Sequence, residues 1–166
     1  MGMSIQPGYT PGALGRVVEL HGTYYGLQWG FGVFFEAKVA VEMAAFLNRF
    51  DEGRDGFWTA MDSGRVEGAI VIDGLHGRDQ GAHLRWFIVS EASRGSGVGG
   101  RLIRSAMTFC RARGYQRVYL WTFQGLDAAR HLYEKEGFTL VESRSGKQWG
   151  VEVLEQRFEC WLSAVG

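Results

Sequence analysis

The spacing of apolar residues changes along the chain and separates helical from extended segments. Between residues 13 and 50, apolar side chains recur every three or four positions, as on one face of a helix. Beyond residue 57, several segments alternate apolar and polar residues, as strands do. The first half of the chain is therefore predicted to contain a strand at 3–8, helices at 13–28 and 34–50, and strands at 57–61 and 66–72. The last two strands flank Asp62-Ser63-Gly64, which predicts a hairpin turn.

The second half alternates strands with helices. A helix with one apolar face is expected at 98–113, and Gly114 is placed to end it. Asp127 is expected to cap a further helix at 128–136. The strands of this half are predicted at 83–89, 116–122, 138–143 and 151–162. This order predicts an α/β (α+β) fold in which one mixed sheet carries helices on both faces.

The second predicted helix has apolar residues on two sides. One stripe consists of Val39, Met43, Phe46 and Phe50, and the other of Ala37, Val41 and Ala44. Such a helix is buried on two sides, or it faces a partner or a ligand. Together with the apolar last strand, this pattern allows a homodimer.

The composition describes a globular chain without a strong overall charge. Of its 166 residues, 18 are basic and 18 acidic, and 46% are hydrophobic, which excludes intrinsic disorder. A net charge of zero argues against a general nucleic-acid binder and against attachment to an anionic membrane. Neither a signal-peptide pattern nor a membrane-spanning apolar segment is present in the sequence, so one cytoplasmic domain over residues 1–166 is expected.

Cysteine and histidine are not arranged as metal ligands. Cys110 and Cys160 are far apart and flanked by apolar residues, and the four histidines form no HxxxH pair. We therefore expect two buried thiols and no metal site.

A glycine-rich segment, Ser93–Arg101, is the clearest chemical signal, because four glycines fall within six positions between a predicted strand and a predicted helix. Glycines let the backbone approach a ligand, and N–H groups at a helix N-terminus attract a phosphate or pyrophosphate. A P-loop is not formed, because Arg101 and Leu102 stand where lysine and Ser/Thr are required. A dinucleotide fingerprint is disfavoured, because the next strand at 116–122 has no acidic residue to hold a ribose.

Two motifs resemble those of the GNAT superfamily of acyl-CoA N-acyltransferases. Arg94-x-x-Gly97-x-Gly99 matches the Q/R-x-x-G-x-G/A pattern of that superfamily. The run Ala129–Phe138, which contains Tyr133, looks like its second signature. The order of predicted elements also resembles the GNAT fold, which implies a central sheet that is mixed and mostly antiparallel.

A closer resemblance involves three shorter features. The run Leu14–His21, the strand end Trp121-Thr122 and the late Gln156 resemble the acetyltransferase domain that is fused to MarR-type regulators. Here that domain would stand alone, because the chain leaves no room for a winged helix.

The resemblance implies that the chain binds acetyl-CoA. The backbone of Phe87, Ile88 and Val89 would pair with the pantetheine arm. The pyrophosphate would be held by Arg94, Gly95, Ser96, Gly97, Val98, Gly99, Gly100 and Arg101. Many members carry an asparagine where this chain has Leu126, so Phe123 and Gln124, which lie nearby, are expected to contact the cofactor instead. Tyr133 would be the general acid that protonates the leaving thiolate of CoA, although an aromatic side chain there could also be a core residue.

The general base is not defined by the resemblance. Many members carry a glutamate on the third strand, but Arg85 occupies that position and is always protonated. His83, two residues earlier on the same strand face, is our hypothesis for the base, because its usual pKa suits neutral pH. Glu19, Glu36 and relay through water are the alternatives.

The acceptor site is expected at the junction of the first two helices. Tyr24, Tyr25 and Trp29 lie there, and the resemblance implies that this junction borders the acceptor. Arg85 would bind a carboxylate of the acceptor if it faces the pocket, and would otherwise pair with an acidic residue such as Glu67.

These features predict an N-acetyltransferase that moves an acetyl group from acetyl-CoA to a primary amine by direct attack. The amine would belong to a small molecule, an amino acid or a peptide. The alternative is a non-catalytic acyl-CoA-binding sensor or interaction module, which the missing glutamate and asparagine favour. A nucleotide-binding oxidoreductase is a weaker third interpretation. No nucleic-acid or membrane partner is expected.

Overall fold

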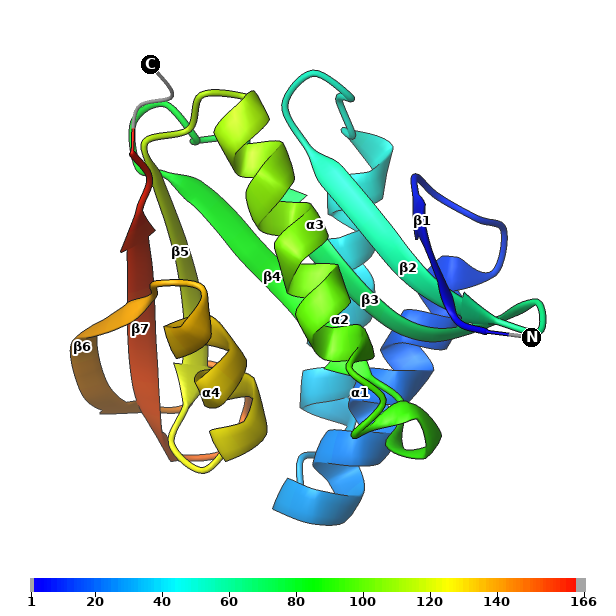
Figure 1. Cartoon of the computed structure of the whole chain (residues 1–166). Helices are drawn as coiled ribbons and strands as arrows, with labels where there is room; N and C mark the ends of the chain where they lie inside the picture. The colour runs from blue at the N-terminus through cyan, green and yellow to red at the C-terminus, as the bar shows by residue number, and fades with distance from the viewer. Residues whose placement is uncertain (1, 164–166) are drawn as a thin grey trace.

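The computed structural model describes residues 2–163 and confirms the predicted order of strands and helices (Figure 1). The described residues form one seven-stranded sheet, in the order β1-β2-β3-β4-β5-β7-β6. The strands are β1 (Ser4–Pro7), β2 (Gly56–Asp62), β3 (Arg65–Asp73), β4 (Ala82–Val89), β5 (Arg117–Phe123), β6 (Thr139–Gly146) and β7 (Val153–Trp161). The helices are α1 (Ala13–Trp29), α2 (Val33–Asn48), α3 (Val98–Ala112) and α4 (Asp127–Lys135), and a short 3₁₀ turn at Glu91–Ser93 follows β4.

Helices cover both faces of the sheet. α3 and α4 lie on one face, and α1 and α2 lie on the other (Figure 1). Because successive strand residues point to opposite faces, Trp58 packs with the α3 cluster, whereas its neighbour Phe57 packs with the α1–α2 cluster. The fold is therefore α+β with a mixed, mostly antiparallel sheet, as predicted.

The helix faces follow the apolar patterns with one difference. The inward residues of α3 are all buried, as predicted, namely Val98, Leu102, Ile103, Ala106, Met107 and Cys110. On α2, Val39, Met43 and Phe46 are buried, but the second apolar stripe lies on the surface, where Val41 is 68% exposed.

β4 and β5 are hydrogen-bonded neighbours at one end only. Their parallel pairing comprises Ala82 with Val118 and His83 with Tyr119, after which the two strands separate (Figure 1). The other neighbouring strands pair antiparallel over most of their length. This separation leaves the later residues of β4 without a partner strand on that side.

A bulge bends β4 where the strands separate. Arg85 pairs with Val71 and Ile88 pairs with Ala69, so β4 has one residue more than β3 across this step. Trp86, within the bulge, has a φ of 48°, which is uncommon for a bulky side chain. The bulge therefore changes the direction of the backbone in the middle of β4.

Two local predictions had different outcomes. The turn at Asp62-Ser63-Gly64 joins β2 to β3, with Ser63 (φ 52°) and Gly64 (φ 78°) both left-handed, as a tight hairpin turn requires. The predicted cap of α4 is wrong, because α4 begins one residue earlier than expected. Leu126 occupies the N-cap position and no side chain caps the helix, whereas Asp127 is the first helical residue.

Gly22 in α1 lies beside the side chain of Glu36 on α2. A Cβ at this position would lie 2.2 Å from Oε1 of Glu36 on α2. The glycine therefore leaves room for a carboxylate against the side of α1.

Candidate active site

A cavity of about 860 Å³ opens where β4 and β5 separate. Its lining comes from both helical layers, since α1 and α2 contribute on one side and the start of α3 and α4 on the other. The glycine-rich segment, the later half of β4 and Tyr133 all line this single cavity. Residues from distant parts of the sequence therefore meet there.

The glycine-rich segment forms one end of the cavity. Gly95 (φ 80°) and Gly97 (φ 85°) adopt left-handed conformations that favour glycine, and Gly97 is the N-cap residue of α3. Backbone N–H groups at this helix end have no partners within the helix, and they carry partial positive charge. Gly95, Gly97, Val98, Gly99 and Gly100 line the cavity, so this end can receive an anion.

Three residues that were predicted to hold the phosphate make other contacts in the structure. Arg94 lines the cavity, but its guanidinium donates to the Val89 carbonyl (3.3 Å) and lies 3.9 Å from the Tyr24 ring centroid. Ser96 does not line the cavity, and its hydroxyl donates to the Ser93 carbonyl. Arg101 lies on another side of α3, where it donates to the Met3 carbonyl (3.0 Å), so the structure does not bring it to the cavity.

The later half of β4 forms a wall of the cavity. Phe87, Ile88 and Val89 all line it, and their edge toward β5 carries no strand. Phe123 from β5 and Leu126, which precedes α4, line the cavity as well. An extended ligand can therefore use backbone groups that a neighbouring strand would otherwise occupy.

Tyr133 on α4 is buried among aromatic rings and still reaches the cavity. Its ring lies about 6.0 Å from those of Phe87 and Phe138, and the residue is 6% exposed. Its hydroxyl makes no hydrogen bond within residues 2–163, but it is not among the fully buried polar atoms without a partner, so it retains accessible surface. Burial, and secondly the nearby Tyr25, raise the pKa of Tyr133, which keeps its proton at neutral pH.

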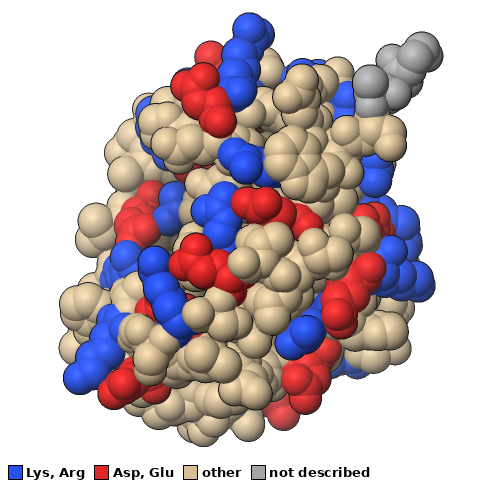
Figure 2. All heavy atoms as spheres, turned by 90° about the vertical axis from the view of Figure 1, so that its left-hand side faces the viewer, with Lys and Arg blue, Asp and Glu red and all other residues tan. Residues whose placement is uncertain are grey.

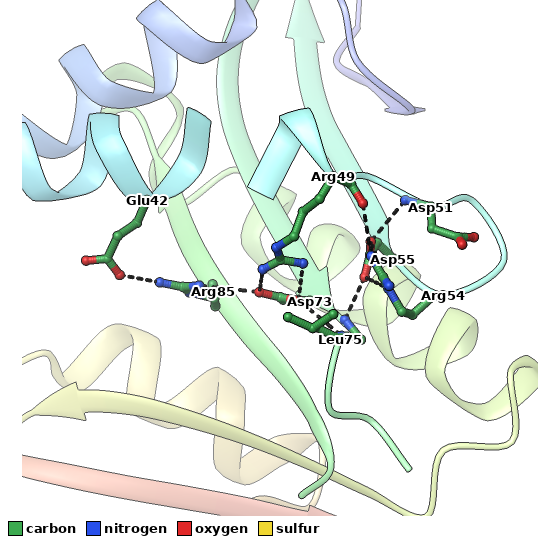
Figure 3. Close-up of polar contacts among 9 residues, drawn as sticks. Glu42, Arg49, Asp51, Arg54, Asp55, Asp73, Leu75 and Arg85 are labelled. Carbon is green, nitrogen blue, oxygen red and sulfur yellow. Dashed lines mark hydrogen bonds and ion pairs between the residues drawn. The ribbon is translucent and has the colours of Figure 1, made fainter. Parts of the chain in front are cut away.

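Charged side chains form a network at the opposite end of the cavity (Figure 3). Arg85 donates from Nη2 to Oε1 of Glu42 (2.6 Å) and from Nη1 to Oδ2 of Asp73 (3.4 Å). Arg49 donates to the same Asp73 carboxylate, and Lys38 pairs with Glu42. Arg85 thus faces the cavity already paired, with Glu42 and Asp73 rather than with Glu67, which pairs with Arg16.

His83 lines the same end of the cavity. Its ring stacks on Tyr119 at 4.5 Å between centroids. Burial, and secondly the charge of Arg85, lower the pKa of His83 to about 3. The ring is therefore neutral at pH 7 and is a weak proton acceptor.

Aromatic residues cover the cavity where α1 meets α2. Tyr24 and Tyr25 line it, and Tyr25 is packed against Phe31, Phe35 and Phe123 with centroids 5.0–5.9 Å away. Burial, followed by the nearby Tyr24, raises the pKa of Tyr25. Trp29 does not line the cavity, because its ring packs edge-on against Phe123 and over Gly125.

Several cavity residues were not singled out from the sequence. His21 lies within the helix predicted at 13–28, so its type was the only signal. Lys38 and Glu42 are four positions apart on α2 and pair with each other, and Trp149 lies in the loop between β6 and β7. Their positions depend on contacts between distant segments. The other missed members include Trp86 and Gln148.

Acidic and basic side chains are interspersed on the side of the molecule that β6 and β7 form (Figure 2). Arg144 pairs there with Glu142 and Glu155, and Arg157 pairs with Glu159. This face therefore presents no broad patch of one sign. No helix within residues 2–163 is long and apolar enough to cross a membrane.

Comparisons with known proteins agree on one family. Residues 16–138 match the sequence profile described as the Acetyltransferase (GNAT) family. A mouse protein named "Probable N-acetyltransferase family 8 member 5" is 31% identical over 118 residues, which are 69% of this chain and 50% of that protein. The mycothiol acetyltransferase of Streptosporangium roseum is 33% identical over 85 residues, 51% of this chain and 23% of that enzyme. The chain thus spans half or less of the length of these relatives.

Solved structures share the fold at low sequence identity. An acetyltransferase from Streptococcus agalactiae is 22% identical, with a TM-score of 0.73 and coverage of 97% of this chain and 99% of that one. A GNAT family acetyltransferase from Elizabethkingia anophelis, solved with acetyl-CoA bound, is 14% identical. Its TM-score is 0.68, with coverage of 96% of this chain and 98% of that one.

Proposed function

Because the chain belongs to the Acetyltransferase (GNAT) family, we propose that it transfers the acetyl group of acetyl-CoA to a primary amine. One observation carries the proposal. The glycine-rich N-terminus of α3, the unpaired edge of β4 and the hydroxyl of Tyr133 line the same cavity. These three features suit a diphosphate, an extended amide-containing arm and a leaving thiolate.

Acetyl-CoA would lie along the cavity with its diphosphate at α3. The phosphate oxygens would accept hydrogen bonds from the N–H groups of Gly95, Gly97, Val98, Gly99 and Gly100, and Arg94 would contribute charge at the edge. The pantetheine amides would pair with the backbone of Phe87, Ile88 and Val89. Phe123 and Leu126 would contact this arm from the other wall of the cavity.

The reaction would proceed by direct attack. The amine nitrogen forms a bond with the thioester carbon, and the developing oxyanion accepts a hydrogen bond from a backbone N–H near Ile88. The C–S bond then breaks, and Tyr133 donates its proton to the departing sulfur and is later reprotonated by water. The amine arrives neutral, and the proton that its nitrogen loses passes to water at the open end of the cavity.

The assignment of His83 as general base remains a prediction, and its low pKa argues against it. A ring whose pKa is about 3 holds a proton poorly at pH 7. Glu19 and Glu36 do not line the cavity, and Glu42, which does, is paired with Lys38 and Arg85. These positions favour proton loss to water.

The acceptor amine would bind between the aromatic cluster and the charged network. Tyr24 and Tyr25 would contact an apolar or aromatic part of the acceptor. Arg85 would contact a carboxylate less readily than a free arginine, because Glu42 and Asp73 already offset its charge. This arrangement favours amines without a carboxylate over free amino acids.

A non-catalytic acyl-CoA sensor is the second candidate. It is favoured by the weakness of two proton acceptors that line the cavity, since Glu42 is paired with Lys38 and Arg85 and the pKa of His83 is lowered to about 3. Three other statements remain predictions. They are the closer resemblance to the domain fused to MarR-type regulators, a homodimer through the exposed stripe of α2, and a cytoplasmic location.

The experiment that separates enzyme from sensor measures thiol release. The full chain is mixed with acetyl-CoA and, separately, with phenethylamine, tryptamine, spermidine and phenylalanine, while calorimetry measures acetyl-CoA binding. Amine-dependent release of CoA would support the enzyme. Binding of acetyl-CoA without release for any amine would support the sensor, and no binding would overturn both.

A further inference from the structure

His21 on α1 is a buried histidine that the reaction described above does not use. It is 5% exposed, and it lines the cavity. Its ring stacks near Tyr25, one turn further along α1, and it lies 6.4 Å from the ring of Phe35 on α2. It therefore lies in the aromatic part of the cavity, on the α1–α2 side.

The hydrogen bond of Nδ1 fixes how the ring can be protonated. Nδ1 lies 2.8 Å from the carbonyl oxygen of Val17, four residues earlier in the same helix. A carbonyl oxygen only accepts hydrogen bonds, so Nδ1 must carry the proton. In the neutral ring, Nε2 then has no proton and acts as a hydrogen-bond acceptor.

Nε2 has no partner among the described residues. The only fully buried side-chain polar atoms without a partner there are Thr59 Oγ1 and Ser90 Oγ, so Nε2 keeps accessible surface. Because the residue is 95% covered by protein and lines the cavity, that surface faces the cavity. A buried acceptor without a partner usually receives a hydrogen bond from water or a ligand.

The environment keeps the ring neutral. Burial lowers the pKa of His21 to about 4, against a smaller opposing effect of the Val17 hydrogen bond. At neutral pH the Nε2 lone pair is therefore available, and the ring is too weak a base to carry away the proton of an amine.

Tyr25 links this position to the general acid. It lies beside His21 on the helix, and it is close enough to Tyr133 to raise the pKa of that residue. A ligand group bound at Nε2 would therefore lie on the Tyr25 side of the cavity.

We propose that Nε2 of His21 accepts a hydrogen bond from an N–H of the neutral acceptor amine and so directs the nitrogen lone pair toward the thioester. This role rests on the proposed acetyltransferase function. The surrounding Tyr25 and Phe35 rings favour arylalkyl amines, and the bond requires an amine that is neutral and still bears an N–H.

The test compares two nearly isosteric variants. His21→Gln places a side-chain oxygen near the position of Nε2, whereas His21→Met has similar length and no comparable acceptor. With phenethylamine and tryptamine as acceptors, His21→Met should lower kcat/KM by about tenfold. The kcat/KM of His21→Gln should stay within about threefold of the wild-type value, and both variants should bind acetyl-CoA with unchanged Kd.

Two further variants complete the comparison. His21→Asn keeps a donor for the Val17 carbonyl but does not reach the Nε2 position, so it should resemble His21→Met. His76→Asn, at an exposed loop position outside the cavity lining, should leave kcat/KM unchanged. Far-ultraviolet circular dichroism checks that each variant is folded.

The outcomes are distinct. Equal kcat/KM for His21→Met and wild type would overturn the proposal, and so would a loss in His21→Gln as large as that in His21→Met. If the wild type binds acetyl-CoA but transfers nothing to any amine, the proposed enzyme function fails and this role fails with it. Active wild type with insensitive His21 variants leaves the enzyme function intact and rejects only this role.

Discussion

Nη2 of Arg85 on β4 lies 2.6 Å from Oε1 of Glu42 on α2, and this ion pair joins the sheet to a helix (Figure 3). Both residues line the cavity. The Arg85 guanidinium also lies over the Trp86 ring, with 4.1 Å to its centroid. Arg85 is therefore held on three sides, by Glu42, by Asp73 and by the ring. Its charge is neutralised from within the protein and is not offered to a substrate.

Removing the charge of Glu42 should change which amines are accepted. In Glu42→Gln, Arg85 loses its anionic partner on α2 and becomes free to bind a carboxylate. The ratio of kcat/KM for phenylalanine to that for phenethylamine should rise by about fivefold. Glu19→Gln, which alters an exposed ion pair with Arg16 outside the cavity, is the matched control and should leave the ratio unchanged.

Loss of the Tyr133 hydroxyl should slow the release of CoA without weakening its binding. Tyr133→Phe removes the proposed acid and keeps the buried ring, so kcat should fall by about 100-fold. Stability should change little, because this hydroxyl has no hydrogen bond within residues 2–163. Tyr9→Phe, at a half-exposed position outside the cavity, should behave as wild type. An unchanged kcat in Tyr133→Phe would remove Tyr133 from the mechanism.

Strain in the glycine-rich segment should weaken cofactor binding specifically. Gly97→Ala places a Cβ on a left-handed residue, which costs about 1–2 kcal/mol and turns the N–H groups at the start of α3. The Kd of acetyl-CoA, measured by calorimetry, should rise by about tenfold. Gly64→Ala imposes a similar strain at the β2–β3 turn and should lower stability while leaving Kd unchanged. Equal effects of both changes on Kd would contradict the phosphate site.

Asp73 should stabilise the fold at neutral pH and lose that effect in acid. Burial raises the pKa of its carboxyl, but the hydrogen bond from Arg49, with further help from Leu75 and Arg85, outweighs burial, so the pKa lies below its usual value. Its contribution is present above the unfolded pKa and disappears as the pH falls through the folded pKa. Asp73→Asn should lower the free energy of unfolding by about 1–3 kcal/mol at pH 7.

Urea denaturation at several pH values measures this contribution. The difference between wild type and Asp73→Asn should narrow as the pH falls below about 4. Asp62→Asn, at the end of β2 beside the hairpin turn, should show no such pH-dependent difference. A difference for Asp73→Asn that stays constant from pH 7 to pH 3 would contradict the lowered pKa.

The loop between β6 and β7 should depend on one buried carboxylate. Glu155 is 2% exposed and accepts hydrogen bonds from the backbone N and the side chain of Gln148 and from Arg144. The loop places Trp149 against Phe123 at the cavity. Glu155→Gln should therefore raise the KM for phenethylamine several-fold while the Kd of acetyl-CoA stays the same. Glu152→Gln, an exposed change in the same loop, is the control.

The sequence predicted the elements well because the chain changes period clearly. The apolar face of α3 and the turn at Asp62-Ser63-Gly64 are local patterns, and both were recovered. The glycine-rich segment and Tyr133 were found because they belong to motifs with fixed spacing. Closeness in sequence was misleading for Arg101. It lies near the glycines in sequence, but its guanidinium is on another side of α3 and donates to the Met3 carbonyl, next to β1.

The end of the cavity that carries the charged network was harder to predict, because it is assembled from contacts between distant segments. Glu42 and Arg85 are 43 positions apart, and neither residue alone indicates their pairing. Trp29 was predicted to line the acceptor site because of its aromatic neighbours. Its ring packs instead against Phe123 and over Gly125, where no side chain blocks it. His21 had the spacing of a core residue, and only the three-dimensional arrangement exposes its free nitrogen to the cavity.

The short pairing between β4 and β5 has a mechanical consequence. Because only two residue pairs join β4 to β5, the sheet has two parts, β1 to β4 and β5 to β7, with a gap between them. Acetyl-CoA bound along β4 would occupy this gap as an additional strand does. At a free acetyl-CoA concentration 100 times its Kd, binding would add about 2.7 kcal/mol to the free energy of unfolding. The amides of Phe87 and Val89 would then exchange with solvent more slowly. The ligand would thus complete the sheet, and the rigidity of this chain would depend on how much acetyl-CoA surrounds it.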